Sequence, residues 1–291
     1  MNRRELMESG ITAGIAMAFA QQAQAARVPI KKAVLGSMLP KELPDWKTKF
    51  AVGKDAGFTH IEMGTVADAK EEAAIAKASA DTGLKVHGVM NGAHWKSPLN
   101  SSDSSVVEES MKGMRISLRN AQAWGAGTVL LVPAVVSANN PYGEAWTKSV
   151  KQIRILLPEY EKAKIIIAVE NVWNKFLLSP LEMTRYIDQF ESPYLWGYFD
   201  VGNVVLTGYP QDWIRTLGKK RIAKVHIKDF RFKNRSAEFV DLFDGEIDWK
   251  EVQRAFADIG YDGVATVELR GGDADYLRDV SKRFDRILEG A

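Results

Sequence analysis

The sequence predicts an α/β protein that folds as a single-domain (β/α)8 TIM barrel, and three observations support this prediction. Short apolar runs alternate with longer segments whose apolar residues recur every three or four positions, the spacing of an amphipathic helix. Runs such as VLLVP and IIIAV are apolar throughout, as in strands buried on both faces of a parallel sheet. Eight strand–helix units of about 30 residues each fit the usual repeat of such barrels.

The eight strands are expected, in chain order, at short apolar runs. They are KKAVLGSM (31–38), GFTHIEMG (57–64), LKVHGVM (84–90), AGTVLLVP (126–133), KIIIAVE (164–170), LWGYFD (195–200), IAKVHIKD (222–229) and GVATVEL (263–269). A doubly wound open sheet is the main alternative. It usually has a glycine-rich phosphate fingerprint after the first strand, and the sequence has none there.

Helices are expected between these strands. Their periodic segments cover 70–83, 108–125, 146–163, 179–190, 248–260 and 273–288. Gly83, Gly125 and Gly260 indicate helix ends, because glycine readily adopts the left-handed conformation that follows a last turn. Pro180 after a serine, and Asp248, indicate helix starts.

The first 25 residues are expected to form a signal peptide. Arg3 and Arg4 precede a short apolar run, ITAGIAMAFA, and AQA at 23–25 offers small residues for cleavage. The run is too short to span a bilayer, so no stable membrane insertion is expected after cleavage. The arginine pair predicts the twin-arginine route, which places the barrel domain, residues 26–291, in the periplasm or outside the cell. A frayed amphipathic helix is the alternative.

Composition excludes several classes of protein. Lys and Arg number 39 against 37 Asp and Glu, so the chain has no overall basic charge with which to bind nucleic acid. It contains no cysteine, which excludes disulfides, thiolate metal ligands and cysteine nucleophiles. No G-x-S-x-G, P-loop or H-E-x-x-H motif is present.

Four predicted strands end in side chains that can bind a metal ion. These strands, five to eight in chain order, end at Glu170, Asp200, His226 and Glu268. Because the active site of such a barrel lies at the C-terminal ends of its strands, we expect the four side chains to converge. Any one of them alone would more often be a salt-bridge partner or a core residue. Three carboxylates and an imidazole together would repel unless a cation lay between them, so the pattern predicts one divalent metal ion.

The ligand types indicate both the ion and its chemistry. Three oxygen donors and one nitrogen favour Mn²⁺ first, then Co²⁺ or Mg²⁺, with Zn²⁺ as a further candidate. Such an ion chelates a ketone oxygen and a neighbouring hydroxyl and stabilises an enediolate. Glu170 and Glu268 are the predicted base and acid. Return of the proton to the opposite face inverts the stereocentre, whereas transfer between adjacent carbons interconverts an aldose and a ketose.

At these residues the sequence resembles the xylose isomerase-like barrel superfamily, in particular the sugar phosphate isomerase/epimerase group. The similarity runs from about residue 31 to about residue 289 and is most specific in AVENVWN, YFDVGN, KVHIKD, HWKSPLNSSD and GEIDWKEVQRAFADIGYDGVATVEL. The resemblance implies metal ligands at the four strand-end residues, proton transfer by the two glutamates, and a homodimer or homotetramer.

The sequence departs from the ketose 3-epimerases of that group at three positions. Asn203 lies three residues after the metal Asp, where they usually carry a substrate-binding His. Phe176 lies where they carry a Glu, and Arg231 lies five residues after the metal His, where their Arg lies six after it. The resemblance thus implies substrate-binding positions at Asn203 and Arg231, while the departures argue against a free ketose as substrate.

Further substrate contacts are expected from side chains near the strand ends. His94 and Trp95 follow the third strand and can stack on and hydrogen-bond a sugar, unless their loop packs on itself. Trp173, three residues after Glu170, is expected to form a wall of the pocket. Glu62 ends the second strand and is expected either to bond a substrate hydroxyl or to pair with a lysine.

Two basic residues near the last strands are also candidates. Lys228 lies two residues after His226, on the same face of the strand, where it can neutralise the enediolate or form a salt bridge to Glu268 or Asp200. Arg270, with two glycines and a helix after it, can hold phosphate, a carboxylate or a sugar hydroxyl. Because an exported enzyme would rarely meet sugar phosphates, a hydroxyl or carboxylate is favoured.

The leading hypothesis is a metal-dependent carbohydrate isomerase or epimerase whose substrate is an unphosphorylated keto sugar or a derivative of one. One alternative keeps the same first step but eliminates a leaving group, as a lyase or dehydratase acting on a 3-keto-glycoside would. A second alternative, of another class, is a periplasmic sugar-binding protein. Such proteins usually have two lobes joined by a hinge, whereas this sequence predicts one continuous barrel.

Overall fold

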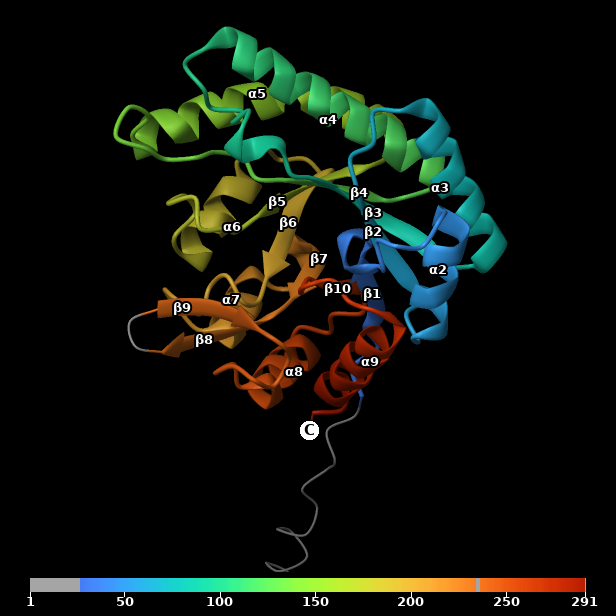
Figure 1. Cartoon of the computed structure of the whole chain (residues 1–291). Helices are drawn as coiled ribbons and strands as arrows, with labels where there is room; N and C mark the ends of the chain where they lie inside the picture. The colour runs from blue at the N-terminus through green and yellow to red at the C-terminus, as the bar shows by residue number, and fades with distance from the viewer. Residues whose placement is uncertain (1–26, 234–235, 291) are drawn as a thin grey trace, which may run out of the picture.

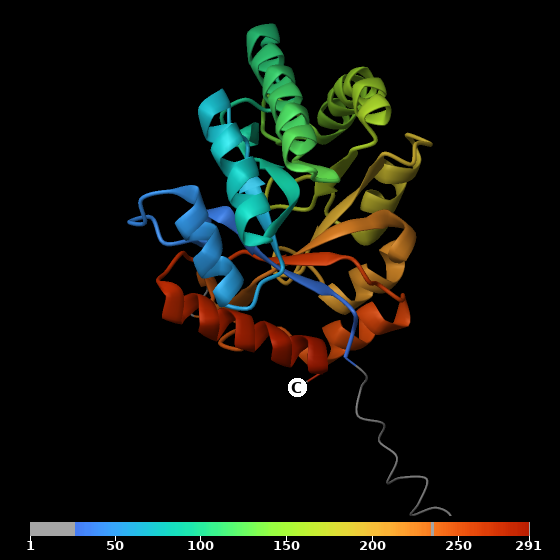
Figure 2. The same cartoon turned by 90° about the vertical axis from the view of Figure 1, so that its right-hand side faces the viewer.

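A computed structural model describes residues 27–233 and 236–290 and contains a closed barrel (Figure 1). Eight parallel strands pair in the order β1-β10-β7-β6-β5-β4-β3-β2, and the helices surround them on the outside (Figures 1 and 2). The predicted (β/α)8 barrel is therefore confirmed. The predicted signal peptide, residues 1–25, lies outside the described residues.

All eight barrel strands coincide with predicted apolar runs. They are β1 (Lys31–Leu35), β2 (His60–Gly64), β3 (Lys85–Asn91), β4 (Thr128–Leu131), β5 (Ile166–Glu170), β6 (Leu195–Asp200), β7 (Ile222–Ile227) and β10 (Val264–Val267). The main helices are α2 (Trp46–Asp55), α3 (Ala69–Thr82), α4 (Ser104–Trp124), α5 (Tyr142–Ala163), α6 (Pro180–Asp188), α7 (Pro210–Leu217), α8 (Trp249–Asp258) and α9 (Ala274–Glu289).

The helix boundaries follow the predicted end signals. Gly83 and Gly125 follow the last residues of α3 and α4 with φ angles of 71° and 69°, a left-handed conformation that glycine adopts without strain. At the starts of α6 and α8, the side chains of Ser179 and Asp248 accept hydrogen bonds from backbone amides of the first turn. Local sequence thus fixes where the chain turns back onto the barrel.

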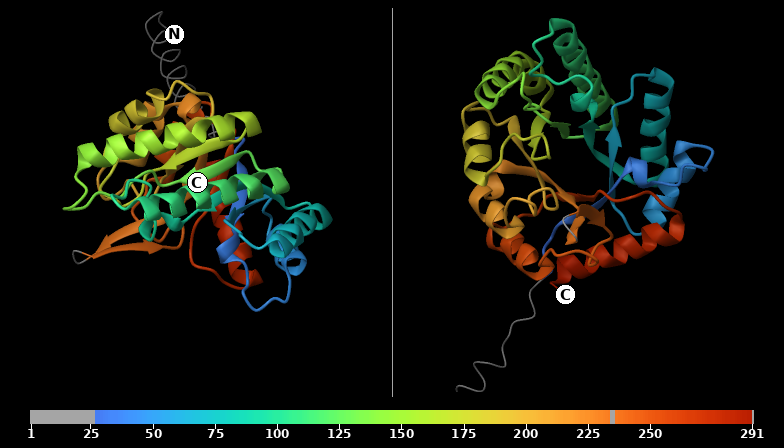
Figure 3. Two further views of the ribbon diagram at one scale, coloured as in Figure 1. Left: turned by 90° about the horizontal axis from the view of Figure 1, so that it is seen from above. Right: turned by 60° about the vertical axis from the view of Figure 1, so that its left-hand side comes forward.

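The structure also contains elements that the sequence analysis did not anticipate. Helices α2 and α7 are short, with 10 and 8 residues, and neither segment was predicted as a helix. A two-stranded antiparallel hairpin, β8 (Asp229–Lys233) and β9 (Ser236–Val240), follows β7 directly. It projects from the barrel (Figure 3). The run expected as one strand at 222–229 is therefore β7 followed by the start of β8.

Strand register aligns the functional strand ends. Asp200 on β6 lies opposite His226 on β7, and Glu170 on β5 lies opposite Tyr198 on β6. Alignment of neighbouring parallel strands brings their C-terminal ends to one mouth of the barrel, where such proteins place their active sites. Among the described residues, no helix has the length and apolar character needed to cross a membrane.

Candidate metal centre

The structure brings the four predicted ligands together. One ligand atom from each of four residues lies within 4.8 Å of all the others; the residues are Glu170, Asp200, His226 and Glu268. This separation is close to twice a metal–oxygen distance of about 2.0–2.6 Å, so one ion can contact all four atoms. Glu170, Asp200 and His226 are buried, and Glu268, just after β10, is partly exposed.

The Nδ1 atom of His226 faces the carboxylates. It lies 2.8 Å from Glu170 Oε1, 3.3 Å from Glu268 Oε2 and 3.8 Å from Asp200 Oδ2. The other ring nitrogen, Nε2, lies 2.9 Å from Glu62 Oε2 on the far side of the ring. His226 therefore presents Nδ1 as the ligand atom, while Glu62 holds the ring in orientation from behind.

Glu62 occupies a different position from the one expected of a substrate contact. Its residue exposure is 0%, and its Oε2 atom also accepts a 2.5 Å hydrogen bond from the Tyr198 hydroxyl. The other expectation for Glu62 was a pair with a lysine. That is not its principal contact either, because the hydrogen-bond partners of this oxygen are His226 and Tyr198. A carboxylate bonded to the remote nitrogen of a metal-binding imidazole fixes the ring and makes it a stronger ligand.

Lys228 forms salt bridges to carboxylates, which was one of the two expectations for it. Its Nζ atom lies 2.9 Å from both Asp200 Oδ2 and Glu268 Oε2, and the residue is 8% exposed. Burial opposes the charged ammonium, but the two carboxylates outweigh it and raise the pKa of Lys228. The lysine therefore stays positively charged beside the two ligands.

The pKa values of the two candidate proton carriers differ. Burial raises the pKa of Glu170 to about 7, against the opposing effect of His226. Burial would also raise the pKa of Glu268, but His226 and Lys228 together outweigh it and lower this pKa to about 2. A divalent cation between the two would favour the ionised form of both carboxyl groups.

The residues present fit a divalent cation. Asp200 Oδ2 is fully buried, and its contact with Lys228 is an ion pair rather than an aligned hydrogen bond, which leaves an oxygen lone pair available. The cluster carries a formal charge of −3 when the imidazole is neutral, from four carboxylates and one ammonium: Glu62, Glu170, Asp200, Glu268 and Lys228. Buried charge of this sign needs a cation to offset it.

A cavity of about 290 Å³, here called the inner cavity, opens onto this centre. Glu170, Glu268 and Lys228 line it, and so do four residues predicted to bind substrate, namely His94, Trp95, Trp173 and Asn203. The structure thus places these four beside the candidate metal ligands.

The residues around the inner cavity are held by local contacts. Trp173 donates from Nε1 to the Asn203 carbonyl at 2.9 Å, and the Asn203 side chain donates to the Asn171 carbonyl at 2.8 Å. Trp95 is 60% exposed and packs against the His94 ring at a centroid distance of 4.8 Å. Burial lowers the pKa of His94 to about 4, so this imidazole is neutral near pH 7.

Arg231 and Arg270 lie outside the inner cavity. Arg231, on β8, pairs with Glu238 on the neighbouring strand β9. The Arg270 side chain is 71% exposed and lies 3.1 Å from Asp241 Oδ2. Both arginines line a second cavity, which also includes the candidate ligand Glu268.

Sequence reasoning missed two side chains at the site. Tyr198 lies two residues before Asp200 on the same strand, so strand periodicity alone could have placed it on the same face. Phe239 lines the inner cavity from β9 and stacks on Trp173 at a centroid distance of 4.9 Å. No local signal indicates Phe239, because only the hairpin brings β9 back over the barrel mouth.

Replacing Glu62 by Gln is expected to weaken Mn²⁺ binding about 10–100-fold without unfolding the protein. Gln keeps the shape and an acceptor for the His226 ring but removes the negative charge that strengthens the imidazole as a ligand. The measurement is a calorimetric titration with Mn²⁺. Tyr198→Phe, which removes only the neighbouring hydroxyl, should have the smaller effect. An unchanged affinity in Glu62→Gln would contradict the orienting role of this carboxylate.

The fold and the site together define a class of barrel protein. The model of the xylose isomerase-like TIM barrel family matches residues 50–287, and the chain belongs to that family. The resemblance inferred from the sequence motifs is thereby confirmed.

Two relatives of this chain are the same kind of enzyme. L-ribulose-5-phosphate 3-epimerase UlaE of Escherichia coli O1:K1 is 25% identical over 262 residues, covering 83% of this chain and 88% of the relative. The same enzyme from Salmonella paratyphi A is 24% identical over 258 residues, with the same coverage. These relatives are sugar epimerases, in agreement with the isomerase or epimerase predicted from the sequence.

Solved structures share the fold. An L-ribulose 3-epimerase superposes with a TM-score of 0.75 at 17% identity, covering 88% of this chain and 93% of that one. The 3-keto-D-glucoside 4-epimerase YcjR of E. coli gives a TM-score of 0.73 at 14% identity, covering 88% and 99%. At these identities the likeness concerns the fold alone.

Proposed function

We propose that the protein is a divalent-metal-dependent carbohydrate epimerase or isomerase that removes a proton from the carbon next to a carbonyl group. The ion is Mn²⁺ in the first instance, and the substrate is a keto sugar or a derivative of one. The relatives that match most of the chain are named sugar epimerases, which supports the carbohydrate substrate.

One observation carries this proposal. Ligand atoms from four consecutive barrel strands lie within 4.8 Å of one another at the strand ends, and two of the residues, Glu170 and Glu268, line the same cavity. A site that needed only to hold a metal would not need two of its carboxylates beside a cavity open to substrate. Carboxylates at that position can accept and donate protons.

The chain's own residues have distinct roles in this chemistry. One of Glu170 and Glu268 takes the carbon-bound proton, which leaves an enediolate, and the other returns a proton to the opposite face. The C–H bond that breaks is replaced by a new C–H bond, so no oxidant is required. A bound divalent ion would polarise the carbonyl and offset the developing negative charge. Lys228, held between Asp200 and Glu268, adds a second positive charge nearby.

Deuterium exchange tests the proposal directly. The Mn²⁺-loaded protein, residues 26–291, is incubated in D₂O with L-ribulose, D-fructose and a 3-keto-glucoside, and the recovered sugars are analysed by mass spectrometry and NMR. Deuterium is expected at the carbon next to the carbonyl of at least one sugar. The absence of exchange with all of them, in protein that binds Mn²⁺, would exclude the proposed proton transfer.

The same experiment distinguishes the lyase alternative. An epimerase or isomerase conserves the mass of the sugar apart from deuterium, whereas an elimination releases water or a fragment. The sugar-binding alternative predicts no exchange at all. The described residues form one barrel rather than two lobes, which favours an enzyme over such a binding protein.

We also propose that the chain is exported by the twin-arginine route, on the basis of Arg3, Arg4 and the short apolar run that follows them. Replacing both arginines by lysine in the full chain is expected to retain the protein in the cytoplasm, as cell fractionation would detect. Equal amounts of the variant and the unaltered chain outside the cytoplasm would contradict twin-arginine export.

A further inference from the structure

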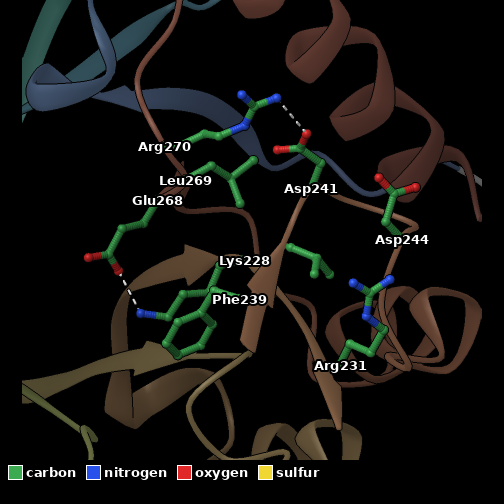
Figure 4. Close-up of a pocket in the computed structure, with 9 residues that line it drawn as sticks. Lys228, Arg231, Phe239, Asp241, Asp244, Glu268, Leu269 and Arg270 are labelled. Carbon is green, nitrogen blue, oxygen red and sulfur yellow. Dashed lines mark hydrogen bonds and ion pairs between the residues drawn. The ribbon is translucent and has the colours of Figure 1, made fainter. Parts of the chain in front are cut away.

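A second cavity, here called the outer cavity, adjoins the candidate metal centre. Its volume is about 780 Å³, larger than the 290 Å³ of the inner cavity and within the range of roughly 300–1,000 Å³ typical of small-molecule sites. It lies between the β8–β9 hairpin and the loop after β10 (Figure 4). Both cavities are lined by Lys228, Phe239 and Glu268, so they meet at these side chains.

Opposite charges balance around the outer cavity. Three cations and three carboxylates line it: Lys228, Arg231, Arg270, Asp241, Asp244 and Glu268. Lys228 Nζ lies 2.9 Å from Glu268 Oε2, and Arg270 lies 3.1 Å from Asp241 Oδ2. Dashed lines in Figure 4 mark both contacts. Arg231 pairs with Glu238 on the hairpin. A phosphate group, with nearly two negative charges, would therefore meet cations that already have carboxylate partners.

The N-terminus of the helix next to this cavity also has a carboxylate partner. The loop with Arg270 leads into α9, and the helix start is a place where phosphate often binds. Here the Asp273 side chain accepts a hydrogen bond from the Tyr276 amide at 2.9 Å and brings its own negative charge. The Tyr276 hydroxyl donates to Asp241 Oδ1 at 2.6 Å. These contacts disfavour an anion at this end of the cavity.

The same groups suit a neutral ring that carries hydroxyls. A sugar hydroxyl both donates and accepts hydrogen bonds. The paired Arg270 guanidinium can donate to it, and the Asp241 carboxylate can accept from it. Phe239, which is 45% exposed, and Leu269 add apolar surface for the C–H faces of a sugar. A large cavity with balanced charge and an exposed ring is therefore best matched by a second sugar.

We propose that the outer cavity is a second sugar subsite, and that the substrate is a keto-glycoside with at least two rings. The ring with the carbonyl group lies at the metal centre in the inner cavity. The neutral ring joined to it by the glycosidic bond lies between the hairpin and the loop after β10. This inference rests on the proposed proton transfer and specifies its substrate class.

The test compares three substrates of the Mn²⁺-loaded protein by their rates of deuterium uptake in D₂O. They are a disaccharide of glucose oxidised to the 3-keto form in one ring, the corresponding 3-keto-glucose monosaccharide, and L-ribulose 5-phosphate. The kcat/KM for the disaccharide is expected to exceed that of the other two about tenfold or more, because the second ring adds hydrogen bonds in the transition state.

A charge-neutral double variant, Arg270→Gln with Asp241→Asn, tests the cavity itself. Both changed residues lie outside the candidate metal cluster. The ratio of kcat/KM for the disaccharide to that for the monosaccharide should fall about tenfold or more. The matched control is Arg115→Gln with Glu159→Gln, an exposed pair 2.8 Å apart on the outer helices, which should leave this ratio unchanged. A second variant, Val240→Phe on β9, should lower the same ratio by filling the cavity.

Three results would overturn the inference. One is a monosaccharide that reacts as well as the disaccharide, and another is a preference for the phosphorylated ketose. The third is an unchanged ratio in both cavity variants. In each case exchange still occurs, so the proposed function stands without the second subsite. If none of the three substrates exchanges its proton, the proposed function itself is wrong and the inference is wrong with it.

Discussion

Replacing Glu268 by Gln is expected to stop the conversion of one epimer into the other, with kcat/KM falling about 10²–10⁴-fold. Gln retains an oxygen that can bind a metal ion, but it cannot accept and return a proton. Glu170→Gln should have the same effect, because inversion needs one carboxylate for each face of the substrate. Both residues line the inner cavity, where substrate is expected.

Deuterium exchange can show whether the two glutamates act on opposite faces. In each variant the remaining glutamate still removes the proton on its own side, so one epimer should exchange and the other should not. The preferred epimer should be the opposite one in the second variant. A purely structural or ligand role would not produce this reversal.

A matched control separates metal binding from proton transfer. Asp200→Asn changes a candidate ligand that has no predicted role as a proton carrier, so at saturating Mn²⁺ this variant should still exchange both epimers. Equal loss of exchange with both epimers in all three variants would mean that the glutamates act only through the metal ion.

Replacing His226 by Ala is expected to abolish metal binding. The purified protein, residues 26–291, should contain about one divalent ion per chain, because one set of four ligand atoms converges in the described structure. The variant loses the only nitrogen ligand of that set. It also loses the ring that hydrogen-bonds to Glu62 and Glu170. Metal content by mass spectrometry is the first measurement, and loss of deuterium exchange should accompany loss of the ion.

Thermal unfolding gives a second readout of the same site. Mn²⁺ at a concentration of 100 Kd stabilises a folded protein by roughly 2.7 kcal/mol. For a chain of this size that corresponds to a rise in Tm of roughly 5–10 °C. The rise should be absent in His226→Ala. A destabilised barrel could also lose metal, so a control for folding is needed.

His87→Ala provides that control. His87 is buried inside the same barrel at 5% exposure and lies 2.9 Å from Thr266 Oγ1, away from the candidate ligand set. This variant should keep the ion and the rise in Tm with Mn²⁺. Loss of metal from both histidine variants would show that the effect comes from general damage to the barrel core.

The substrate class proposed for this chain differs from that of the relatives. The relatives named above are L-ribulose-5-phosphate 3-epimerases. In this chain the cations around the outer cavity have carboxylate partners, and Asp273 caps the nearby helix. If the second subsite is confirmed, the hairpin and the loop after β10 are the parts of this chain that select the substrate for the candidate metal centre.

Much of the candidate metal centre was predictable from the sequence. A strand's periodicity shows which residue ends it, and parallel strands of a barrel present their C-terminal ends at one mouth. Glu170, Asp200 and His226 could therefore be placed together from local patterns alone. Glu268 follows the same logic, since its backbone amide still bonds to Ile227 at the end of β7.

Other assignments needed the tertiary structure. Glu62 was expected to end its strand like the ligands, but β2 continues to Gly64. Glu62 lies behind the His226 ring, which stands between its carboxylate and the candidate ligand set. Sequence position cannot decide which of several nearby charges a side chain will pair with. Lys228 could have been an unpaired cation, but beside the inner cavity its ammonium lies between Asp200 and Glu268.

By itself, then, the sequence determined the barrel, its order of strands and the four candidate metal ligands, because these depend on periodicity and on the type of residue at each strand end. Only the tertiary structure decided what surrounds them. The β8–β9 hairpin carries Phe239 to the barrel mouth and, with Arg270 and Asp241, forms the outer cavity. Such contacts join residues far apart in the chain, and their geometry depends on packing that no local pattern encodes.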